Sequence, residues 1–596
     1  MCAIAGILST SSWTPTLDTA LLSMQASLRH RGPDDKGTWT DPAAGVGLAH
    51  TRLAILDLSP AGHQPMSTPD SRFTIVFNGE IYNFRSLRAE LESAGVKFQS
   101  HSDTEVLLRL YEKKGTSMVN DLRGMFAFCI WDEQSRSAFL ARDPLGIKPL
   151  YYSIQPDRLI FASELRAIRN SGLVSSQLDG NAITEFLETG SVPEPLTLLN
   201  DVRCLEAGHS LTWKEGHVEF NQFWQLHFPE TTPNPDAAQL TRNALLDSMQ
   251  AHFVSDVPVG VFLSGGIDST ALVALARELG QHDLQTFSIG VDDPSLDESS
   301  IARKTAAHFG TQHHEWRLTG ALGASKFAAF LDHMDQPSID GFNSFTVSSF
   351  ARDQGMKVVL SGLGGDELFA GYPSFQQVPK LARLSRRLHA IPGAAPALGA
   401  LLARFAPQPK WRRLGSFLQE PPTVPNAYRT FRGIFSPAEA HLLASRYTAP
   451  AFKPALPSPS QLQSSTPTDE DALSALELTR YMRNQLLRDS DVMSMAHGLE
   501  LRVPFVDKLL FETLATLPAT QRLQPGKKLL LQAVPEVPDW VANQPKRGFT
   551  FPFEKWLEAS WGDSFLNATK SIHFSNPTWY QRWAVFMLDH WLAKTA

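Results

Sequence analysis

The chain has 596 residues, 43% of them hydrophobic, and a formal net charge of −7 at pH 7. A chain of this length can bury several cores, so two or three domains are expected. The acidic balance excludes the basic surface typical of nucleic-acid binding, and three cysteines are too few for a disulfide framework or a cysteine-rich metal site. No basic segment precedes the first apolar residues, and no apolar run approaches the ~20 residues of a membrane span. We therefore expect a cytoplasmic protein with no membrane or nucleic-acid partner.

The chain begins Met1-Cys2-Ala3-Ile4. If Met1 is removed, Cys2 carries a thiol and a free α-amine, whose unperturbed pKa values of about 8.5 and about 7.7–8.0 both lie near neutrality. Such a residue is a nucleophile that has its own base, which favours acyl-transfer chemistry. Taken alone, an incidental cysteine near a chain end is the simpler interpretation.

The first ~220 residues alternate short apolar runs with turn residues and a few helical stretches. Strands are expected at 73–77 and 126–131, and helices at 87–93 and 105–113. This pattern predicts an α+β sandwich with helices on its faces. Residues 228–235 are rich in proline and have the composition of a linker.

After the linker, the pattern of expected helices and strands changes. Helices are expected at 237–252, 271–279 and 298–309, and apolar strands at 257–263, 284–289 and 357–360. Strands and helices that alternate at these lengths predict βαβ units and therefore a parallel sheet. Residues 449–470 are rich in proline and serine, and we interpret them as a surface insertion.

A glycine-rich turn, Ser264-Gly265-Gly266-Ile267-Asp268-Ser269, lies between an expected strand and an expected helix. Such a turn directs backbone N–H groups and a helix N-terminus at a bound phosphate. It lacks the Gly-Lys-Ser/Thr ending of a Walker A loop. Instead, it resembles the pyrophosphate loop of enzymes that cleave ATP between the α and β phosphates. In those enzymes the serine and glycine positions hold pyrophosphate and the aspartate helps to position Mg²⁺. The alternative is a tight turn with a capping side chain.

A second glycine turn, Ser361-Gly362-Leu363-Gly364-Gly365-Asp366-Glu367, also follows an expected strand. Asp366 and Glu367 are expected at the mouth of the same sheet, where carboxylates can hold Mg²⁺ or a substrate ammonium group. Capping of a helix N-terminus explains one carboxylate, but it explains the whole glycine-rich turn less well.

Together, these blocks resemble the glutamine-hydrolysing asparagine synthetase family over nearly the full length of the chain. The first half carries motifs similar to a class II glutamine amidotransferase: Cys2-Ala3-Ile4-Ala5-Gly6, Arg29-His30-Arg31-Gly32-Pro33-Asp34, His50-Thr51-Arg52-Leu53, Phe77-Asn78-Gly79-Glu80 and Ser102-Asp103-Thr104-Glu105. The second half adds both glycine turns, Leu499-Glu500-Leu501-Arg502-Val503-Pro504-Phe505 and Pro545-Lys546-Arg547-Gly548-Phe549.

The resemblance implies a fold and domain boundaries. We expect an αββα Ntn-hydrolase sandwich, which is the glutaminase domain, over residues 2–220. A linker is expected at 221–237. An α/β pyrophosphate-loop synthetase domain with a helical C-terminal part is expected over residues 238–596.

In the first half, the resemblance implies that Cys2 is the nucleophile and that its α-amine is the base. The Asn78 side chain and the Gly79 N–H would form the oxyanion hole. Arg52 would bind the glutamine α-carboxylate, and Glu80 and Asp103 would hold its ammonium group. From the residues alone, a surface ion pair explains Arg52 and Asp103, and a hairpin turn explains Asn78-Gly79.

In the second half, the resemblance implies an ATP and pyrophosphate site with Mg²⁺. Its residues would be Leu263, Ser264, Gly265, Gly266, Asp268, Ser269, Ile289, Ser361, Gly362 and Lys546. Leu263 and Ile289 would contact adenine mostly through their backbone, and Asp268 and Asp366 would be the metal-associated carboxylates. Asp491 and Arg502 also match family positions, but structural ion pairs explain them equally well.

The implied substrates are glutamine, ATP and aspartate, and a homodimer is left open. One position departs from the family, because Leu363 stands where an acidic residue is usual. Either Asp366 or Glu367 substitutes for that acid, or the acceptor is another carboxylate such as a sugar acid, a peptide or a cell-wall precursor. Three other functions are considered: a β-lactam-synthetase-like cyclase, an amidotransferase that forms glucosamine phosphate or phosphoribosylamine, and a non-catalytic binding protein. The intact Cys2, Arg52 and Asp103 motifs argue against the first, and the Ser264 turn argues against the second.

Overall fold

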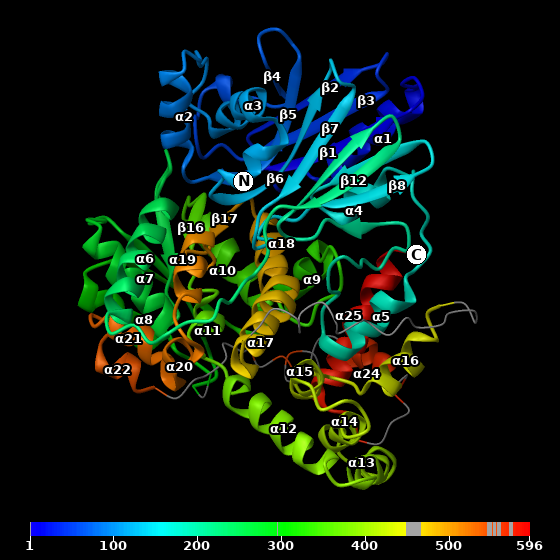
Figure 1. Ribbon diagram of the computed structural model, residues 1–596, viewed down its shortest axis with the longest axis vertical. Helices are drawn as coiled ribbons and strands as arrows, with labels where there is room; N and C mark the ends of the chain where they lie inside the picture. The colour runs from blue at the N-terminus through cyan, green and yellow to red at the C-terminus, as the bar shows by residue number, and fades with distance from the viewer. Residues whose placement is uncertain are drawn as a thin grey trace.

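The computed structural model describes residues 2–294, 296–448, 467–544, 562–570 and 576–595, together with residues 551, 553, 556 and 572. Two layers of β-strands lie above a second half that is mostly helical (Figure 1). Among the described residues, no single helix is both long and apolar enough to cross a membrane. Only α12 (Ser374–His389) and α13 (Ala394–Phe405), which are bent by 119° relative to each other, pass that test when taken together.

The first half contains two six-stranded antiparallel sheets. In spatial order, the first comprises β10 (Arg203–Cys204), β8 (Tyr151–Gln155), β9 (Arg158–Ala162), β1 (Ala3–Ser9), β3 (Val46–Arg52) and β2 (Asp35–Asp41). The second comprises β12 (His217–Gln222), β11 (His209–Lys214), β7 (Ser137–Arg142), β6 (Gly124–Asp132), β5 (Phe73–Ile81) and β4 (Met66–Ser67). The strands expected at 73–77 and 126–131 are therefore the central parts of β5 and β6.

Apolar side chains on the facing sides of the two sheets form one core, which includes Ile4, Leu48, Val76, Cys129 and Trp131. The outer faces are covered by helices: α1 (Pro15–Ser27), α4 (Leu165–Asn170) and α5 (Gly180–Thr189) on the first sheet, and α2 (Phe84–Ser93) and α3 (Asp103–Lys114) on the second. Because both faces of each central strand are covered, β1 is buried along its whole length. The αββα sandwich expected from the sequence is confirmed.

The second half is built on a five-stranded parallel sheet. Its order is β15 (Gln312–Leu318), β14 (Gln285–Val291), β13 (Val259–Phe262), β16 (Val358–Leu360) and β17 (Glu500–Arg502). The helices nearest to the sheet are α6 (Ala237–His252), α7 (Ile267–Glu278), α8 (Ser299–Phe309), α9 (Gly320–His333), α10 (Phe342–Asp353) and α11 (Gly365–Leu368). The expected parallel α/β arrangement is confirmed, with Ser264–Gly266 and Ser361–Gly364 both following the carboxyl ends of neighbouring strands.

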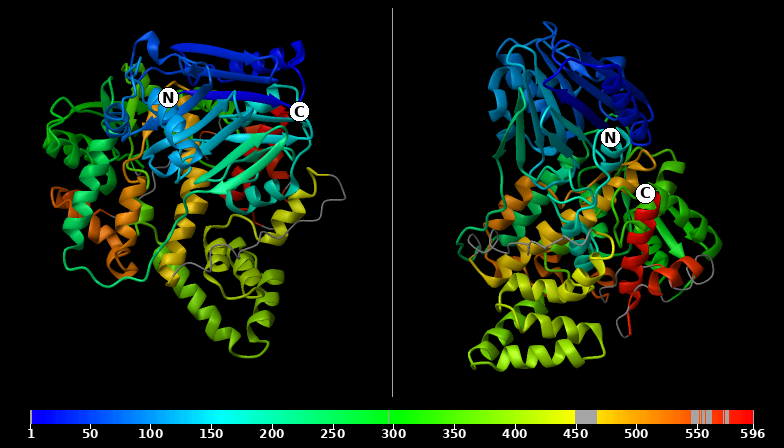
Figure 2. Two further views of the ribbon diagram at one scale, coloured as in Figure 1. Left: turned by 45° about the horizontal axis from the view of Figure 1, so that its top comes forward. Right: turned by 90° about the vertical axis from the view of Figure 1, so that its right-hand side faces the viewer.

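The C-terminal part is helical, as expected. It contains α12 (Ser374–His389), α13 (Ala394–Phe405), α14 (Pro409–Phe417), α15 (Val424–Arg432), α16 (Pro437–Ala444), α17 (Asp469–Leu476), α18 (Arg488–Met495), α19 (Lys508–Ala515), α20 (Ala519–Arg522), α21 (Lys528–Ala533), α22 (Asp539–Ala542), α24 (Gly562–Lys570) and α25 (Trp579–Thr595). Helices α12 to α14 project from the body of the molecule in both views of Figure 2. Of the expected insertion at 449–470, residues 449–466 lie outside the described residues.

One long helix contains an unusual segment. Between α17 and α18, residues Glu477–Leu487 (η4) form a π-helix of 11 residues. In a π-helix each carbonyl bonds five residues ahead, and such segments are rare and occur frequently at functional sites. Nothing in the hydrophobic pattern of this helix distinguishes it from an α-helix.

The two halves share a hydrophobic core. Phe186 of α5 belongs to the same buried cluster as Phe327 of α9 and Trp583 of α25. The expected linker is also anchored, because Phe228 packs edge-on against Phe511 of α19, with ring centroids 5.4 Å apart. Burial of this kind holds the sandwich in a fixed position relative to the parallel sheet.

Candidate active site

Cys2 lies at the start of β1, the strand between β3 and β9. Its backbone N–H donates to Oδ1 of Asn78 at 3.4 Å, and its carbonyl oxygen accepts from Nε of Arg31 at 3.3 Å. The side chain is half-buried and the thiol is free. Burial raises the pKa of the Cys2 thiol. Because the thiolate is the nucleophilic form, this cysteine requires an adjacent base to react at neutral pH.

Beside Cys2, the polar groups of Asn78 and Gly79 lie on the central strand β5. Asn78 is fully buried, and its Nδ2 has no hydrogen-bond partner among the described residues. A buried donor left unpaired costs about 1–3 kcal/mol, so its retention favours a ligand oxygen as partner. At Gly79, a Cβ atom would lie 2.0 Å from the Met125 carbonyl oxygen of the paired strand β6. Only glycine permits this close approach of the two strands. Asn78 and Gly79 lie within β5, so they do not form the hairpin turn considered from the sequence.

The residues expected to bind the glutamine ammonium group are buried carboxyl groups. Asp103 accepts a hydrogen bond from the Ile81 N–H at 3.0 Å, and burial raises its pKa to about 6. Burial also raises the pKa of Glu80 well above its usual value, and the neighbouring Glu500 carboxylate raises it further. A bound cation would favour the ionised form of both buried carboxyl groups and so lower their pKa values.

Arg52, which would bind the glutamine carboxylate, lies at the end of β3 and is 7% exposed. Its guanidinium donates to the carbonyl oxygens of Ser59 at 3.1 Å and Leu56 at 3.3 Å, and also to that of Asp57. This excludes the surface ion pair considered from the sequence. The 56–59 loop orients the Arg52 side chain at the edge of the same site.

The second candidate site lies at the carboxyl ends of β13 and β16. Ser264 follows β13, and its Oγ lies 3.2 Å from Oγ of Ser269 in the first turn of α7. The two glycine turns touch at Asp268, because a Cβ atom on Gly365 would lie 2.4 Å from its Oδ1. The absence of a side chain at 365 therefore lets the two loops form one surface.

Lys527, which the sequence analysis missed, connects the two turns. Its Nζ contacts Oδ2 of Asp268 and lies 2.5 Å from Oδ1 of Asp366. The lysine is 4% exposed and has a left-handed backbone conformation, with φ 57°. The only signal in the sequence is Pro525-Gly526, a turn that is common in loops. No other prediction from the sequence depended on Lys527.

A single cavity of about 2120 Å³ covers these loops. Seven of the ten expected nucleotide-site residues line it, as does Asp366: Ser264, Gly265, Gly266, Asp268, Ser269, Ser361 and Gly362. Leu263 and Ile289 do not; their side chains belong to hydrophobic cores, so only their backbone is available to adenine. Lys546 lies outside the described residues.

Glu367 is not among the residues that line the cavity, unlike its neighbour Asp366. It is 1% exposed and accepts a hydrogen bond from the Tyr372 hydroxyl at 2.8 Å. Burial raises its pKa to about 8. The geometry therefore disfavours Glu367 as a substitute for the missing acid at 363, and we retain only Asp366 for that role.

Among the residues with described positions, no group of three or more His, Cys, Asp or Glu side chains is arranged to hold a metal ion. Asp268 and Asp366 nevertheless converge on one cation, the Lys527 ammonium. Mg²⁺ in nucleotide sites is usually bound by one or two carboxylates together with phosphate oxygens and water. The donor set fits that mode of binding.

The two candidate sites are joined by buried ion pairs. Arg502 of β17 contacts Glu500 at 2.5 Å and Glu80 of β5 at 3.5 Å. Asp491 of α18 contacts Arg31 at 2.7 Å and Lys148 at 3.1 Å. The ion pairing considered for Asp491 and Arg502 from the sequence is therefore present, and in both cases it crosses between the halves.

Comparisons with known proteins show the family of the chain. Residues 1–224 match the glutamine amidotransferase domain family, and residues 240–575 match the asparagine synthase family. The chain belongs to the glutamine-hydrolysing asparagine synthetase family. It is 34% identical to asparagine synthetase [glutamine-hydrolyzing] 1 of Bacillus subtilis, over 94% of this chain and 88% of that one.

Two further relatives show the range of the family. A putative asparagine synthetase [glutamine-hydrolyzing] of Mycobacterium bovis is 34% identical, over 92% of this chain and 86% of its own. A protein of Gibberella zeae named amidase chry2 is 28% identical, over 89% and 84%. Membership identifies this chain as an ATP-dependent ligase that hydrolyses glutamine.

Proposed function

We propose that the chain transfers the amide nitrogen of glutamine to a carboxylic acid that it has activated as an acyl-adenylate. The observation that supports the proposal is that two groups of expected site residues lie in one molecule. Cys2 and the unpaired Nδ2 of Asn78 form the first, and the two glycine turns joined at Asp268 form the second. The proposed glutaminase domain spans residues 2–220, the linker 221–237 and the synthetase domain 238–596.

In the first site, Sγ of Cys2 attacks the side-chain carbonyl carbon of glutamine. The α-amine of Cys2, freed by removal of Met1, accepts the thiol proton and returns it to the departing ammonia. Asn78 Nδ2 and the Gly79 N–H stabilise the oxyanion. Water then cleaves the thioester and releases glutamate. Arg52, Glu80 and Asp103 hold the α-carboxylate and ammonium groups of the substrate.

In the second site, the Ser264–Ser269 turn holds the phosphates of ATP. A carboxylate oxygen of the acceptor attacks the α-phosphorus, and pyrophosphate leaves. Ammonia attacks the acyl carbon, and AMP leaves. When bound, Mg²⁺ neutralises phosphate charge, and Asp268 and Asp366 would hold it. Lys527 supplies fixed positive charge at the same place, and Lys546 is a further candidate contact of pyrophosphate.

Transfer between the sites requires exclusion of water, because free ammonia is mostly protonated at neutral pH and is then not nucleophilic. The shared core and the buried ion pairs at Arg502 and Asp491 are consistent with a closed path between the halves. This requirement explains why both activities reside on one chain.

Two acceptors are candidates. Aspartate is the first, since the similar synthetases of Bacillus and Mycobacterium are named for asparagine. Another carboxylic acid is the second, and Leu363 favours it: this residue lines the cavity and packs against an apolar cluster, so it offers no charge to an amino-acid substrate. A homodimer stays an expectation.

The decisive experiment compares two variants. Cys2→Ala should abolish release of glutamate from glutamine while leaving AMP formation with added ammonia and the acceptor. Asp268→Ala should have the opposite effect: glutamine hydrolysis should be retained and AMP formation should be lost. If either variant lost both activities while keeping its fold, the proposed division of labour would be wrong.

A further inference from the structure

The cavity above the nucleotide loops is larger than its proposed substrates require. Small-molecule sites usually have volumes of ~300–1,000 Å³, whereas this cavity has about 2120 Å³. It extends from Ser264 and Leu363 to residues of α5, α15 and α25 that lie far from both glycine turns in the sequence. We call the part of this cavity that lies away from the glycine turns the acceptor chamber.

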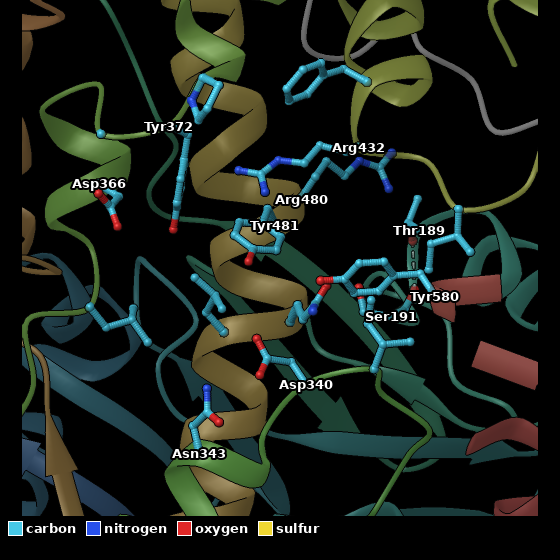
Figure 3. Close-up of a pocket in the computed structure, with 18 of the residues that line it drawn as sticks. Thr189, Ser191, Asp340, Asn343, Asp366, Tyr372, Arg432, Arg480, Tyr481 and Tyr580 are labelled. Atoms are coloured by element: carbon cyan, nitrogen blue, oxygen red, sulfur yellow. Dashed lines mark hydrogen bonds between the residues drawn. The ribbon is translucent and has the colours of Figure 1, made fainter. Parts of the chain in front are cut away.

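The acceptor chamber is defined by six lining residues: Asp340, Tyr372, Arg432, Arg480, Tyr481 and Tyr580. Figure 3 shows Arg432 and Arg480 beside Tyr481, with Tyr580 on another side and Asp340 beneath. Arg480 and Tyr481 belong to the π-helical segment η4, whose residue Gln485 also lines the cavity. The irregular part of this long helix is thus the part that faces the chamber.

The two arginines of the chamber differ in their partners. Arg432 is neutralised, because its Nη2 lies 2.7 Å from Oε2 of Glu477, and its guanidinium stacks over the Tyr481 ring at 3.9 Å. No side-chain hydrogen bond or ion pair of Arg480 is found in the described part of the chain. A partly buried guanidinium without an anion is suited to a carboxylate of the ligand, which it can bind through two parallel hydrogen bonds.

Arg480 interacts electrostatically with Glu185, but burial outweighs that interaction at the Glu185 carboxyl group. Burial raises the pKa of both Glu185 and Asp340, so their anionic forms are disfavoured. Lys410 and Arg413 also line the cavity, as does Arg429, which is paired with Glu420. Away from the glycine turns the cavity therefore attracts a ligand with negative charge beyond the carboxylate that reacts.

The walls of the chamber favour side-chain recognition of rings. They are formed largely by helices (α10, α15, η4 and α25), whose backbone donors and acceptors are used within the helices. Among the described lining residues, Phe262 alone belongs to a strand, and that strand, β13, lies inside its sheet, so it offers a peptide no free edge to pair with. The available groups are aromatic rings, at Tyr372, Tyr481, Trp579 and Tyr580, and planar polar groups. Aromatic faces stack against the C–H faces of sugar rings, and guanidinium and carboxyl groups bind sugar carboxylates and vicinal hydroxyls.

We propose that the acceptor is an acidic oligosaccharide. One uronate carboxylate lies at Ser361–Leu363 for adenylation, the sugar rings lie among the chamber tyrosines, and Arg480 binds a second carboxylate. This inference rests on the proposed function and names the substrate class of its second site.

The first test measures AMP release with glutamine and ATP for a panel of acids. The panel contains aspartate, glucuronate, galacturonate, the di- and trisaccharides of galacturonate, and a triglutamate peptide. We expect the oligosaccharides to raise AMP release above the acid-free background, with the highest kcat/KM for the trisaccharide. AMP release with aspartate or the peptide while every uronate stays at background would overturn the proposal that the acceptor is an acidic oligosaccharide. So would a panel in which no acid gives AMP.

The second test uses Arg480→Gln, which removes the charge and keeps most of the side-chain length. Loss of a hydrogen-bonded charged contact should raise KM for trigalacturonate about tenfold to hundredfold, while KM for ATP and glutamine hydrolysis stay unchanged. Arg480→Lys should restore part of the affinity. Arg383→Gln, at an arginine that is 53% exposed on α12, is the matched control. An unchanged KM in Arg480→Gln would refute the role of Arg480.

Isothermal titration of trigalacturonate into the full chain with a non-hydrolysable ATP analogue provides a readout that does not depend on turnover. Binding should be present in the wild type and weakened in Arg480→Gln. The proposed function is judged separately by hydrolysis of glutamine in the wild type and its loss in Cys2→Ala. Failure of the oligosaccharide panel with intact Cys2-dependent hydrolysis would overturn this inference only.

Discussion

Nη2 of Arg502 lies 3.5 Å from Oε1 of Glu80, and the two residues belong to different halves of the molecule. The Arg502 carbonyl oxygen also accepts a hydrogen bond from the Ser361 N–H at 2.8 Å. One residue of β17 therefore contacts both the proposed glutamine site and the loop of the proposed nucleotide site. Arg502 is fully buried, so this connection is shielded from solvent.

The first prediction concerns this contact. Arg502→Gln leaves Glu80 and Glu500 buried without their cation, and breaking a buried ion pair in this way costs about 3–5 kcal/mol. We expect that loss in the free energy of unfolding, measured by denaturant titration. The double variant Arg502→Gln/Glu500→Gln, which removes one of the two carboxylates, should recover part of it. Equal stability of the wild type and the single variant would contradict the role of Arg502.

The second prediction concerns the oxyanion hole. Asn78→Ala removes a buried amide donor next to Cys2, and loss of one such donor typically lowers kcat by ~10²–10³. Glutamine hydrolysis should fall by that factor, whereas AMP formation with added ammonia should persist. Measurement of both activities on one preparation separates the two sites. A fall in both by the same factor would point to unfolding rather than catalysis.

The third prediction is a pH dependence of glutamine binding. Burial raises the pKa of Asp103 to about 6, so the group becomes protonated at a higher pH than an exposed aspartate. The carboxylate that would attract the glutamine ammonium group is therefore lost as the pH falls through about 6. KM for glutamine should rise about tenfold per pH unit below that value. Asp103→Asn should have a high KM and a flat profile; a flat profile in the wild type would refute the assignment.

The fourth prediction concerns Lys527. Lys527→Met removes the ammonium group between Asp268 and Asp366, which should slow AMP formation by at least about tenfold because phosphate charge loses a fixed counter-charge. Glutamine hydrolysis should be unaffected. The neighbouring Lys528, which is exposed, gives the matched control Lys528→Met. Identical AMP formation in the two variants would exclude Lys527 from the site.

The fifth prediction concerns Leu363. Leu363→Glu introduces an acid that can bind the ammonium group of an amino acid, so AMP formation with aspartate should rise relative to the wild type. Leu363→Met, which conserves side-chain volume, should change neither acceptor preference nor stability by more than about 1.5 kcal/mol. If Leu363→Glu also behaves like the wild type, position 363 contributes only packing.

The sequence predicted the elements whose signals are local. Helices at 237–252 and 298–309 were expected within one residue of α6 and α8, because their apolar positions follow a helical period. Gly365 and the turn at Ser264 marked the nucleotide loops, since a close approach of backbones requires glycine. Lys527 gave no such signal, because its role depends on two carboxylates that lie more than 150 residues away in the chain.

By itself, the sequence determined the family, the sandwich followed by a parallel sheet, and the residue types at both proposed sites. These features depend on short motifs and on hydrophobic periodicity, and both can be recognised within one continuous segment of the chain. Only the tertiary structure decided that Glu367 turns away from the cavity, that Arg502 joins the two halves, and that Arg480 projects from a π-helical segment into the acceptor chamber. Each of these depends on side chains from distant segments meeting in a buried place, where contact geometry and desolvation rather than local preference set the outcome.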